Sequence, residues 1–223
     1  MNYQVKSIDY QDCKEWFLKK HYAKRIPPIE FCFGLYNEDI LVGVCSYGTP
    51  VSSVLRELFP SYKLYELNRL VVSEGLPKNS LSYFVAKTII FIPKPSVLVS
   101  YADTSQNHNG YIYQATNWIY AGDTAKGKEY WHKGKRLHSR QVSEKGWNIQ
   151  QGQKRKTVKP SECDIVETKG KHRYLMPLDK ETRDKIASLS KPYPKRTKEQ
   201  ELESPSNLGG ATPTCALHSK SST

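Results

Sequence analysis

The sequence predicts an α+β protein with α/β/α layers, in which helices flank a mixed, mostly antiparallel sheet. Apolar runs at 31–35 and 40–47, separated by a polar turn, indicate an antiparallel hairpin. Two further apolar runs, at 64–72 and 97–101, are each followed by a polar turn and a helical pattern. Hairpins combined with strand–helix units are typical of a partly antiparallel sheet with helices packed on it.

The first half of the chain alternates apolar segments with clear breaks. Pro27 and Pro28 end an early amphipathic helix because proline cannot continue the helical hydrogen bonds. Asn79 or Ser80 is suited to cap a later helix. The elements expected here are a strand at 3–8, a helix at 10–22, the hairpin, a loop or short helix at 48–62, the strand at 64–72 and a helix at 80–91.

The second half contains the strand at 97–101, a polar loop and a segment rich in aromatic residues. We expect that segment to be a helix over 110–120, because Gly122 is placed to end it. The segment 147–156 is polar and basic. The other elements expected in this half are a closing hairpin of strands at 129–131 and 136–142, joined at Lys133 and Gly134, before that segment and a strand at 171–176 after it.

Composition divides the 223 residues into a domain at 1–190 and a tail at 191–223. This length suits one domain and a tail. From about residue 191 the chain is rich in Pro, Ser, Thr and Lys, and we expect it to be disordered because it has too few apolar residues to form a core.

The charge of the chain is strongly positive. The formal net charge of +12 and isoelectric point near 9.4 favour an acidic partner, most simply nucleic acid, although the charge can also serve solubility alone. The basic region 124–175 holds 14 lysines and arginines against five acids. The residues expected to contact nucleic acid are Lys24, Arg25, Lys133, Lys135, Arg136 and Arg140.

The five cysteines are odd in number, and no two of them form a CxxC pair. This pattern matches no zinc site, and it predicts reduced thiols in the cytoplasm, with Cys32 and Cys45 as small core residues. No apolar run approaches the length of a membrane span. The start of the chain does not have the pattern of a signal peptide.

Polar side chains gather where the 97–101 strand ends, which is where ligands bind in α/β sheets. Asp103 follows this strand, and Tyr113 belongs to the next helix. We interpret Asp103 as a carboxylate that accepts a substrate proton, polarises water or binds a metal, and Tyr113 as a proton donor to a leaving group. The plainer interpretations are that Asp103 caps a turn and that Tyr113 is a core aromatic.

Arg69 is a cation within an otherwise apolar strand, so it needs a carboxylate or phosphate partner, and Asp103 on the neighbouring strand is a candidate. The turn after residue 72 leads into a helix whose N–H groups and dipole suit a pyrophosphate. Ser82 near this helix start is either a phosphate ligand or a cap. The cofactor-binding residues expected are Leu70, Val71, Val72, Lys78, Asn79, Ser80 and Ser82.

The order of elements resembles the acetyl-CoA-dependent N-acetyltransferase (GNAT) superfamily. Four segments then resemble, more narrowly, the Mom family of bacteriophage DNA-modification proteins. These segments are HYAKRIPP at 21–28, YELNRLVV at 65–72, LPKNSLSYF at 76–84 and YADTS…GYIYQATNWIYAG at 101–122. The resemblance runs from about residue 14 to residue 140.

The resemblance implies a phage enzyme that alters the exocyclic N6 amine of adenine in double-stranded DNA and so protects it from host restriction. It implies a methylcarbamoyl or carbamoylmethyl adduct, acetyl-CoA as donor and a requirement for iron. The matching functional positions are His21, Tyr22, Arg69, Ser82, Asp103 and Tyr113. Of these, His21, Tyr22 and Asp103 are the candidate metal ligands, and His108 is a further candidate for that set.

One segment departs from the superfamily pattern. Acetyltransferases of this type carry a glycine-rich pyrophosphate loop, whereas the matching segment here, SEGLPKNSLS, has only Gly75. Side chains of Lys78, Ser80 and Ser82 would have to replace contacts that such a loop makes through its backbone.

Three functions fit these observations. The first is modification of adenine N6 in duplex DNA, which requires a flipped base held by an aromatic residue such as Tyr130, Trp131 or Tyr47. The second is acetylation of an RNA base or of a nucleic-acid-associated protein. The third is DNA binding without chemistry. A homodimer is also left open.

Overall fold

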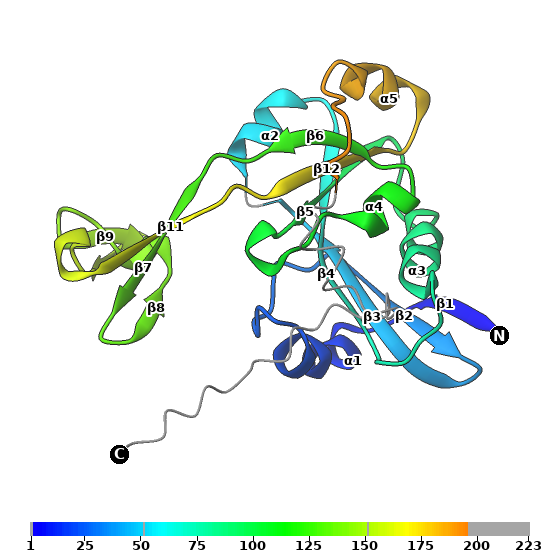
Figure 1. Ribbon diagram of the computed structural model, residues 1–223, viewed down its shortest axis with the longest axis horizontal. Coiled ribbons are helices and arrows are strands. Elements are labelled where there is room, and N and C mark those ends of the chain that lie inside the picture. Colours follow the sequence, from blue (N-terminus) through cyan, green and yellow to red (C-terminus); the bar gives the residue numbers. More distant parts are fainter. Residues whose placement is uncertain (1, 51, 151, 196–223) are drawn as a thin grey trace.

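The computed structural model describes residues 2–50, 52–150 and 152–195. Within them is a seven-stranded sheet in the order β1-β2-β3-β4-β5-β12-β6, in which the β4–β5 pair alone is parallel (Figure 1). The predicted mixed, mostly antiparallel sheet is therefore confirmed. Its strands are β1 (Tyr3–Ser7), β2 (Phe31–Asn37), β3 (Ile40–Gly48), β4 (Lys63–Val72), β5 (Ser96–Ala102), β6 (Ile119–Asp123) and β12 (His172–Pro177).

Helices cover both faces of this sheet, and together they form the body of the protein. Neighbouring residues on a strand point to opposite faces, so Val97 and Leu98 of β5 belong to different core clusters. The cluster around Leu98 packs on α3 (Ser80–Ile89) and α4 (Tyr111–Ala115). The opposite face packs on α1 (Tyr10–Glu15), the π-helical turn η1 (Trp16–Lys20), α2 (Ser53–Leu58) and α5 (Lys180–Ala187).

Two irregularities of β4 leave an opening in the sheet between β4 and β5. β4 pairs with β5 only from Lys63 to Glu66. Its pairing with β3 shifts between Arg69 and Leu67, which leaves Asn68 as the extra residue of a β-bulge. Bulges re-aim side chains and are frequent beside active sites. The second half of β4 therefore runs without a partner on its β5 side.

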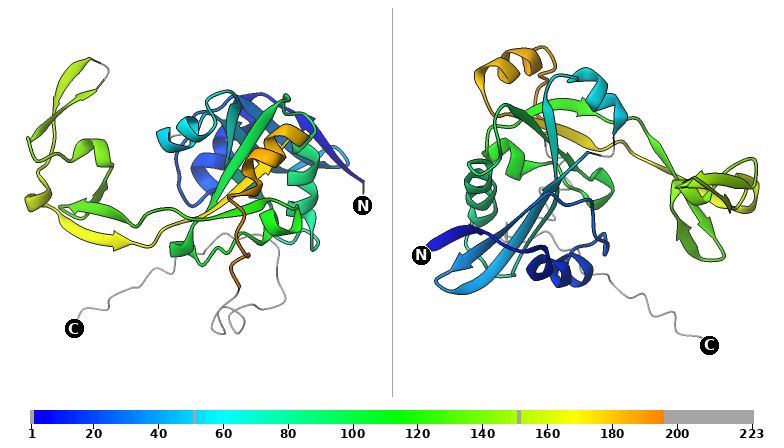
Figure 2. Two further views of the ribbon diagram at one scale, coloured as in Figure 1. Left: turned by 90° about the horizontal axis from the view of Figure 1, so that it is seen from above. Right: turned by 180° about the vertical axis from the view of Figure 1, so that it is seen from behind.

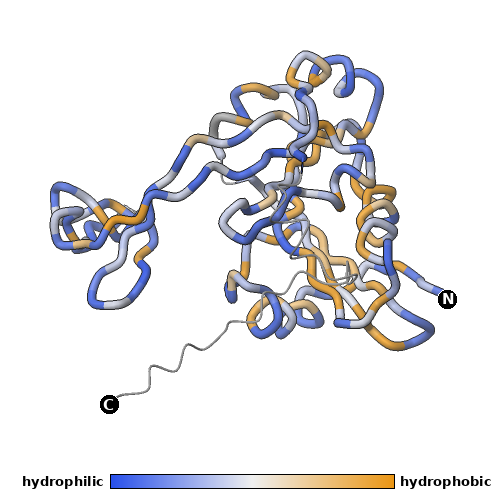
Figure 3. The backbone as a smooth tube through the Cα atoms, viewed as in Figure 1, coloured by the Kyte–Doolittle hydropathy of each residue, from blue (hydrophilic) through white to orange (hydrophobic). Residues whose placement is uncertain are grey.

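Residues 124–171, which we call the arm, leave the body between β6 and β12. The arm projects away from the sheet, and it is mostly hydrophilic along its length (Figures 2 and 3). It holds 13 lysines and arginines and five acids. Its strands form one sheet in the order β11-β7-β8 and one hairpin, β9–β10. They are β7 (Gly127–His132), β8 (Lys135–Leu137), β9 (Trp147–Gln150), β10 (Gln153–Lys156) and β11 (Asp164–Thr168).

The helix predicted over 110–120 is wrong in its second half. α4 ends at Ala115, and residues 119–123 form strand β6, so Gly122 ends no helix. The backbone turns at Asn117, whose φ is 60°. β6 then pairs with β12, a strand far away in the sequence. Long-range pairing with buried aromatics therefore overrides a locally helical pattern.

The remaining predictions for the body are largely confirmed. The hairpin, the strands at 64–72 and 97–101, the helix after residue 79 and the last strand all form, and residues 48–62 contain a short helix. β9, β10, β11 and α5 were not predicted. Of the expected disordered tail, residues 196–223 lie outside the described residues. In the described ranges, no helix is both long and apolar enough to cross a membrane.

Candidate active site

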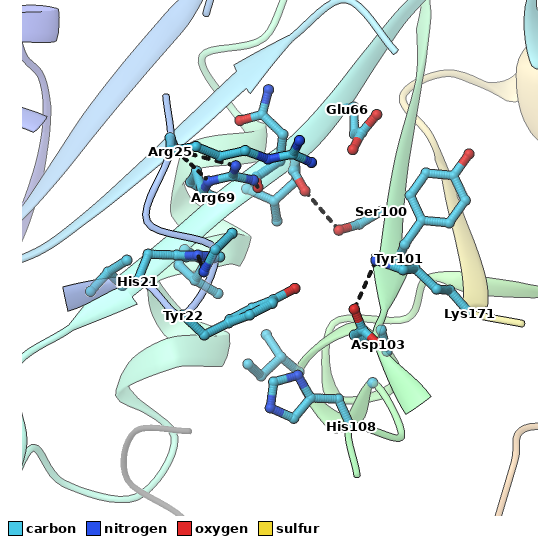
Figure 4. Close-up of a pocket in the computed structure, with 18 of the residues that line it drawn as sticks. His21, Tyr22, Arg25, Glu66, Arg69, Ser100, Tyr101, Asp103, His108 and Lys171 are labelled. Carbon is cyan, nitrogen blue, oxygen red and sulfur yellow. Dashed lines mark hydrogen bonds and ion pairs between the residues drawn. The ribbon is translucent and has the colours of Figure 1, made fainter. Parts of the chain in front are cut away.

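A cleft of about 1110 Å³ opens where β4 and β5 separate (Figure 4). The body contributes the second half of β4, the end of β5, the loop after η1 and the loop before α4. The arm contributes residues of β7 and β8 and the turn that follows them, and Lys171 at its base. The same cleft is thus bordered by the predicted strand-end residues and by the basic arm.

Ser100 and Tyr113 lie at the fork between the two strands. The Ser100 hydroxyl oxygen is 2.8 Å from the Leu67 carbonyl oxygen across the fork and 2.7 Å from the Tyr113 hydroxyl. A carbonyl only accepts, so the single Ser100 proton goes to Leu67, and Tyr113 donates to Ser100. Burial raises the pKa of Tyr113 to about 12, so its phenol is protonated at neutral pH. Tyr113 also packs on Trp118 and Tyr174.

Asp103 is held on two sides. Its Oδ2 is 2.8 Å from Lys171 Nζ, and its Oδ1 accepts from the backbone and hydroxyl of Ser105 at 3.1 and 2.6 Å. Burial raises the pKa of Asp103, but the hydrogen bonds from Lys171 and Ser105 outweigh this effect and lower it. Asp103 therefore caps a short turn, as its plainer interpretation says, and also faces the cleft as a carboxylate.

Arg69 does not bond to Asp103, so the predicted partnership is wrong. Its Nε and Nη2 donate to the carbonyl of Arg25 at 3.3 and 3.2 Å, and its Nη1 donates to the carbonyl of Asn68 at 2.5 Å. The Arg69 side chain is nevertheless buried, with 9% of the residue exposed. Asp103 pairs with a lysine from the arm because the β12 end of the arm passes beside β5.

The bulge at Asn68 fixes the loop that carries the segment HYAKRIPP. The Asn68 amide donates to the Pro28 carbonyl at 2.7 Å and accepts from the Ser46 hydroxyl at 2.7 Å. The loop can approach this closely because residue 48 is glycine, since a Cβ there would overlap the Pro28 carbonyl. Two of the four segments that carry the resemblance, at 21–28 and 65–72, are thus packed on each other.

His21, Tyr22 and His108 form an aromatic group at the rim of the cleft (Figure 4). The rings of His21 and Tyr22 stack with 4.4 Å between centroids, and His108 meets the edge of Tyr22 at 6.1 Å. Burial and then the charge of Arg69 lower the pKa of His21 to about 3, so its ring is neutral. Burial also raises the pKa of Tyr22 and lowers the pKa of His108.

The predicted metal set of His21, Tyr22 and Asp103 does not fit an iron ion. His21 Nδ1 accepts from the Ala23 backbone at 3.0 Å, and Asp103 is neutralised by Lys171. Across the described ranges, no group of three or more His, Cys, Asp and Glu residues is arranged to hold a metal. A metal site needs ligands with free lone pairs and uncompensated negative charge, whereas the Nδ1 lone pair of His21 is already used and the charge of Asp103 is compensated.

The predicted cofactor residues separate into two groups. Leu70, Val71 and Val72 border the cleft. The four polar residues of the turn and helix start do not border it, and two of their hydroxyls bond locally. Ser80 donates to the Pro77 carbonyl, and Ser82 donates to the Asn79 carbonyl. The four residues outside the cleft are Lys78, Asn79, Ser80 and Ser82.

The predicted nucleic-acid residues are also divided. Arg25 and Arg136 border the cleft, and Arg136 forms an ion pair with Glu129 at 2.6 Å. Lys24, Lys133, Lys135 and Arg140 lie outside it and are exposed. Among the aromatic residues suggested for holding a base, Tyr47 is fully buried and bonds to Thr88, which excludes it. Tyr130 and Trp131 are half-buried in the arm.

Sequence reasoning missed Ser100, Glu66 and Lys171 as cleft residues. Alternation along the two strands gave a signal for the first two, because a polar residue in an apolar strand must face a partner or a cleft. Lys171 gave no local signal, since it is one of many lysines in the arm.

Together, the fold and the site define an α+β protein with a positively charged cleft at a split in its sheet. The model of the Mom protein family matches residues 2–195. The chain therefore belongs to the Mom protein family, as the four segments predicted. A search of curated proteins found no match.

Solved structures with a similar arrangement include several acetyltransferases. The IAA acetyltransferase from Bacillus cereus has a TM-score of 0.45 and 11% identity, covering 79% of this chain and 99% of its own. The ribosomal-protein-S5-alanine acetyltransferase from Vibrio fischeri has a TM-score of 0.45 and 12% identity, covering 80% and 94%. A putative acetyltransferase from Salmonella typhimurium, solved with acetyl-CoA, has a TM-score of 0.43 and 10% identity, and the match covers 81% of this chain and 96% of that one. At such values the likeness carries no argument about function.

Proposed function

We propose that this protein is an enzyme that modifies the exocyclic N6 amine of adenine in double-stranded DNA. The observation that carries this proposal is the cleft at the β4–β5 split, which brings together Arg69, Asp103 and Tyr113 and is also bordered by the basic arm. A protein that only binds DNA has no need of such a cluster inside a strand opening. Membership of the Mom family supports the same function.

The three residues have complementary chemistry. The N6 amine of adenine is a weak nucleophile and must lose a proton when it attacks. The Asp103 carboxylate is ionised, and it uses only part of its four lone-pair sites on Lys171 and Ser105, so it can accept that proton directly or through a water. Tyr113, with a pKa of about 12, is suited to give a proton to a leaving thiolate.

Acetyl-CoA is the donor that we propose. When bound, it supplies an activated acyl carbon and a thiolate leaving group. Leu70, Val71 and Val72 expose the free edge of β4 in the cleft, where their backbone groups can bind an extended chain. The turn and helix start after β4 remain a candidate for binding its phosphates through the backbone. Iron is not part of the proposal, because the candidate ligands do not fit it.

An amine inside a stacked duplex is out of reach, so the adenine must leave the helix to enter the cleft. The arm supplies cations for the flanking phosphates, because it carries most of the excess charge and borders the cleft. Attack of N6 on the acyl carbon, with loss of the CoA thiolate, gives an N6-acyl adduct, and its proposed role is to protect phage DNA from host restriction. The methylcarbamoyl or carbamoylmethyl adduct that the resemblance implies contains a further nitrogen, which acetyl transfer alone does not supply.

Mass spectrometry of nucleosides from the genomic DNA of bacteria that express this chain tests the proposal. We expect a deoxyadenosine derivative heavier than the parent, absent from cells that express Asp103→Ala at the same level. If the DNA is unmodified while transfer RNA or a bound protein carries a new acyl group, the substrate is wrong and the second of the three functions holds. If neither is modified, the protein is not this enzyme.

A further inference from the structure

The cleft contains two arginines that come from separate segments of the chain and border the same space. Arg69 comes from the bulged part of β4, and Arg25 comes from the loop that the bulge anchors. Both border the cleft. The acids that border the cleft are Glu66, Asp103 and Glu129. Asp103 and Glu129 form ion pairs with Lys171 and Arg136, and the charge of Glu66 acts on Arg69.

The hydrogen bonds of Arg69 leave part of its guanidinium for a ligand. A guanidinium has five N–H donors in a planar fork. Bonds to the carbonyls of Arg25 and Asn68 use three of them, one each on Nε, Nη1 and Nη2. One N–H on each Nη atom is left. Two such donors in one plane match two oxygens of a phosphate.

The local electrostatics are unfavourable without an anion. Arg69 is buried beside a second guanidinium, and a buried cation next to a like charge is costly. Burial and then Arg25 lower the pKa of Arg69, and the opposing effects of Tyr22 and Glu66 do not compensate. The same residues also help to keep His21 neutral. A bound dianion or monoanion would remove this penalty.

We propose that Arg69 and Arg25 form a phosphate-binding subsite inside the cleft. The subsite lies between β4 and the loop after η1, and it is separate from the turn and helix start after Val72, where a pyrophosphate was expected. Its ligand is a phosphate group, which comes either from the target DNA strand beside the flipped adenine or from a phosphorylated donor. This choice of source rests on the proposed function, whereas phosphate binding itself does not.

The first test uses inorganic phosphate as the probe and the thermal unfolding temperature of the full chain as the readout. We expect phosphate to stabilise the wild-type protein more than chloride does at equal ionic strength. The expected increase in apparent dissociation constant is tenfold or more for Arg69→Gln and for Arg25→Gln. Lys24→Gln removes the same charge one residue from Arg25 but outside the cleft, and it should change little.

Arg25→Gln should fold, because the Arg25 side chain is exposed and the bond to Arg69 is made by the backbone carbonyl of residue 25, which the substitution keeps. If Arg69→Gln does not fold, Arg25→Gln alone decides. Equal phosphate affinity in wild type, Arg25→Gln and Lys24→Gln would overturn the subsite, and so would an equal loss in Arg25→Gln and Lys24→Gln.

The second test distinguishes the two sources. Duplexes that carry one neutral methylphosphonate beside the target adenine are compared with the unmodified duplex. If the subsite binds DNA, one such position weakens binding to wild type but not to Arg25→Gln. If it binds the donor, Arg25→Gln weakens binding of acetyl-CoA, and every methylphosphonate acts alike on both proteins. A positive first test with no DNA modification would reject the proposed function and leave the subsite.

Discussion

Trp118 in the body and Trp147 in the arm have opposite surroundings. Trp118 in the body is fully buried and packs on Tyr113. Trp147 in the arm is half-buried, with Lys154 Nζ 4.3 Å from its ring centre and Lys145 Nζ 5.6 Å from it. Burial in the body holds side chains in a fixed geometry, which a catalytic reaction requires. In the arm, aromatic rings and cations are accessible to a binding partner. The difference indicates that the body holds the reacting groups and that the arm captures the substrate.

The largest effect should come from removing the carboxylate in the body. Asp103→Asn keeps the size of the side chain but removes its charge and its ion pair with Lys171. We expect the rate of DNA modification to fall by about 10²–10⁴-fold, as for other groups that transfer protons. Binding of a duplex, measured by fluorescence anisotropy, should change less than twofold. Full activity in Asp103→Asn would show that Asp103 has no part in the chemistry.

The packing of the two regions can be compared with a matched pair of glycines. Gly110 and Gly134 have nearly equal φ values of 75° and 73°. A Cβ on Gly110 in the body would overlap the ring of Tyr174, whereas a Cβ on Gly134 in the arm would meet nothing within 4 Å. We expect Gly110→Ala to lower the free energy of unfolding by about 2–4 kcal/mol and Gly134→Ala by about 1 kcal/mol. Denaturant unfolding measures both, and equal costs would contradict this account of packing.

The positive charge of the arm should determine mainly how DNA affinity depends on salt concentration. The substitutions Lys154→Gln, Arg155→Gln and Lys156→Gln together remove three exposed charges from β10. If each contacts a phosphate, the slope of log affinity against log salt should become shallower by up to about 2.7. A control with Lys6→Gln, Lys180→Gln and Lys185→Gln removes the same charge from exposed positions on the body. If both triple variants change the slope equally, the arm has no special role in binding.

The smallest effect that we expect is on the pH dependence of stability, and it comes from His21 in the body. The pKa of His21 is about 3 in the folded protein, below its ordinary value of 6.5, so the unfolded chain binds the proton more tightly. This group therefore makes stability fall as pH drops through 6.5, by about 1.5 kcal/mol between pH 6.5 and pH 5. His21→Gln should remove that part of the pH dependence in urea unfolding. If the free energy of unfolding of His21→Gln depends on pH as strongly as that of the wild type, a different group causes this dependence.

Local patterns in the sequence predicted the elements whose partners are close in the chain. The β2–β3 hairpin and the strand β4 followed from alternation and turn residues. The helix predicted beyond Ala115 failed because β6 exists only through its pairing with β12. In the arm, the predicted hairpin joined at Lys133 and Gly134 is confirmed as β7 and β8, although β8 ends at Leu137 and not at residue 142. The strands β9, β10 and β11 were not predicted, because their residues are mostly polar and charged and give no apolar pattern.

The candidate site was predicted as a set of residues but not as a set of contacts. Asp103, Tyr113 and Arg69 do border one cleft. Their partners Lys171, Ser100 and the Arg25 carbonyl were not predicted, because each comes from a separate part of the chain. The role of Asn68 was also hidden, since a β-bulge depends on the register with β3.

The division between body and arm is tested most directly by the rate of duplex modification as a function of DNA concentration and salt. The account predicts that the β10 triple variant has a raised KM with an unchanged kcat, and that low salt restores its activity. It predicts that Asp103→Asn stays inactive at any DNA concentration and any salt. A lowered kcat in the arm variant, or recovery of Asp103→Asn at low salt, would contradict the division.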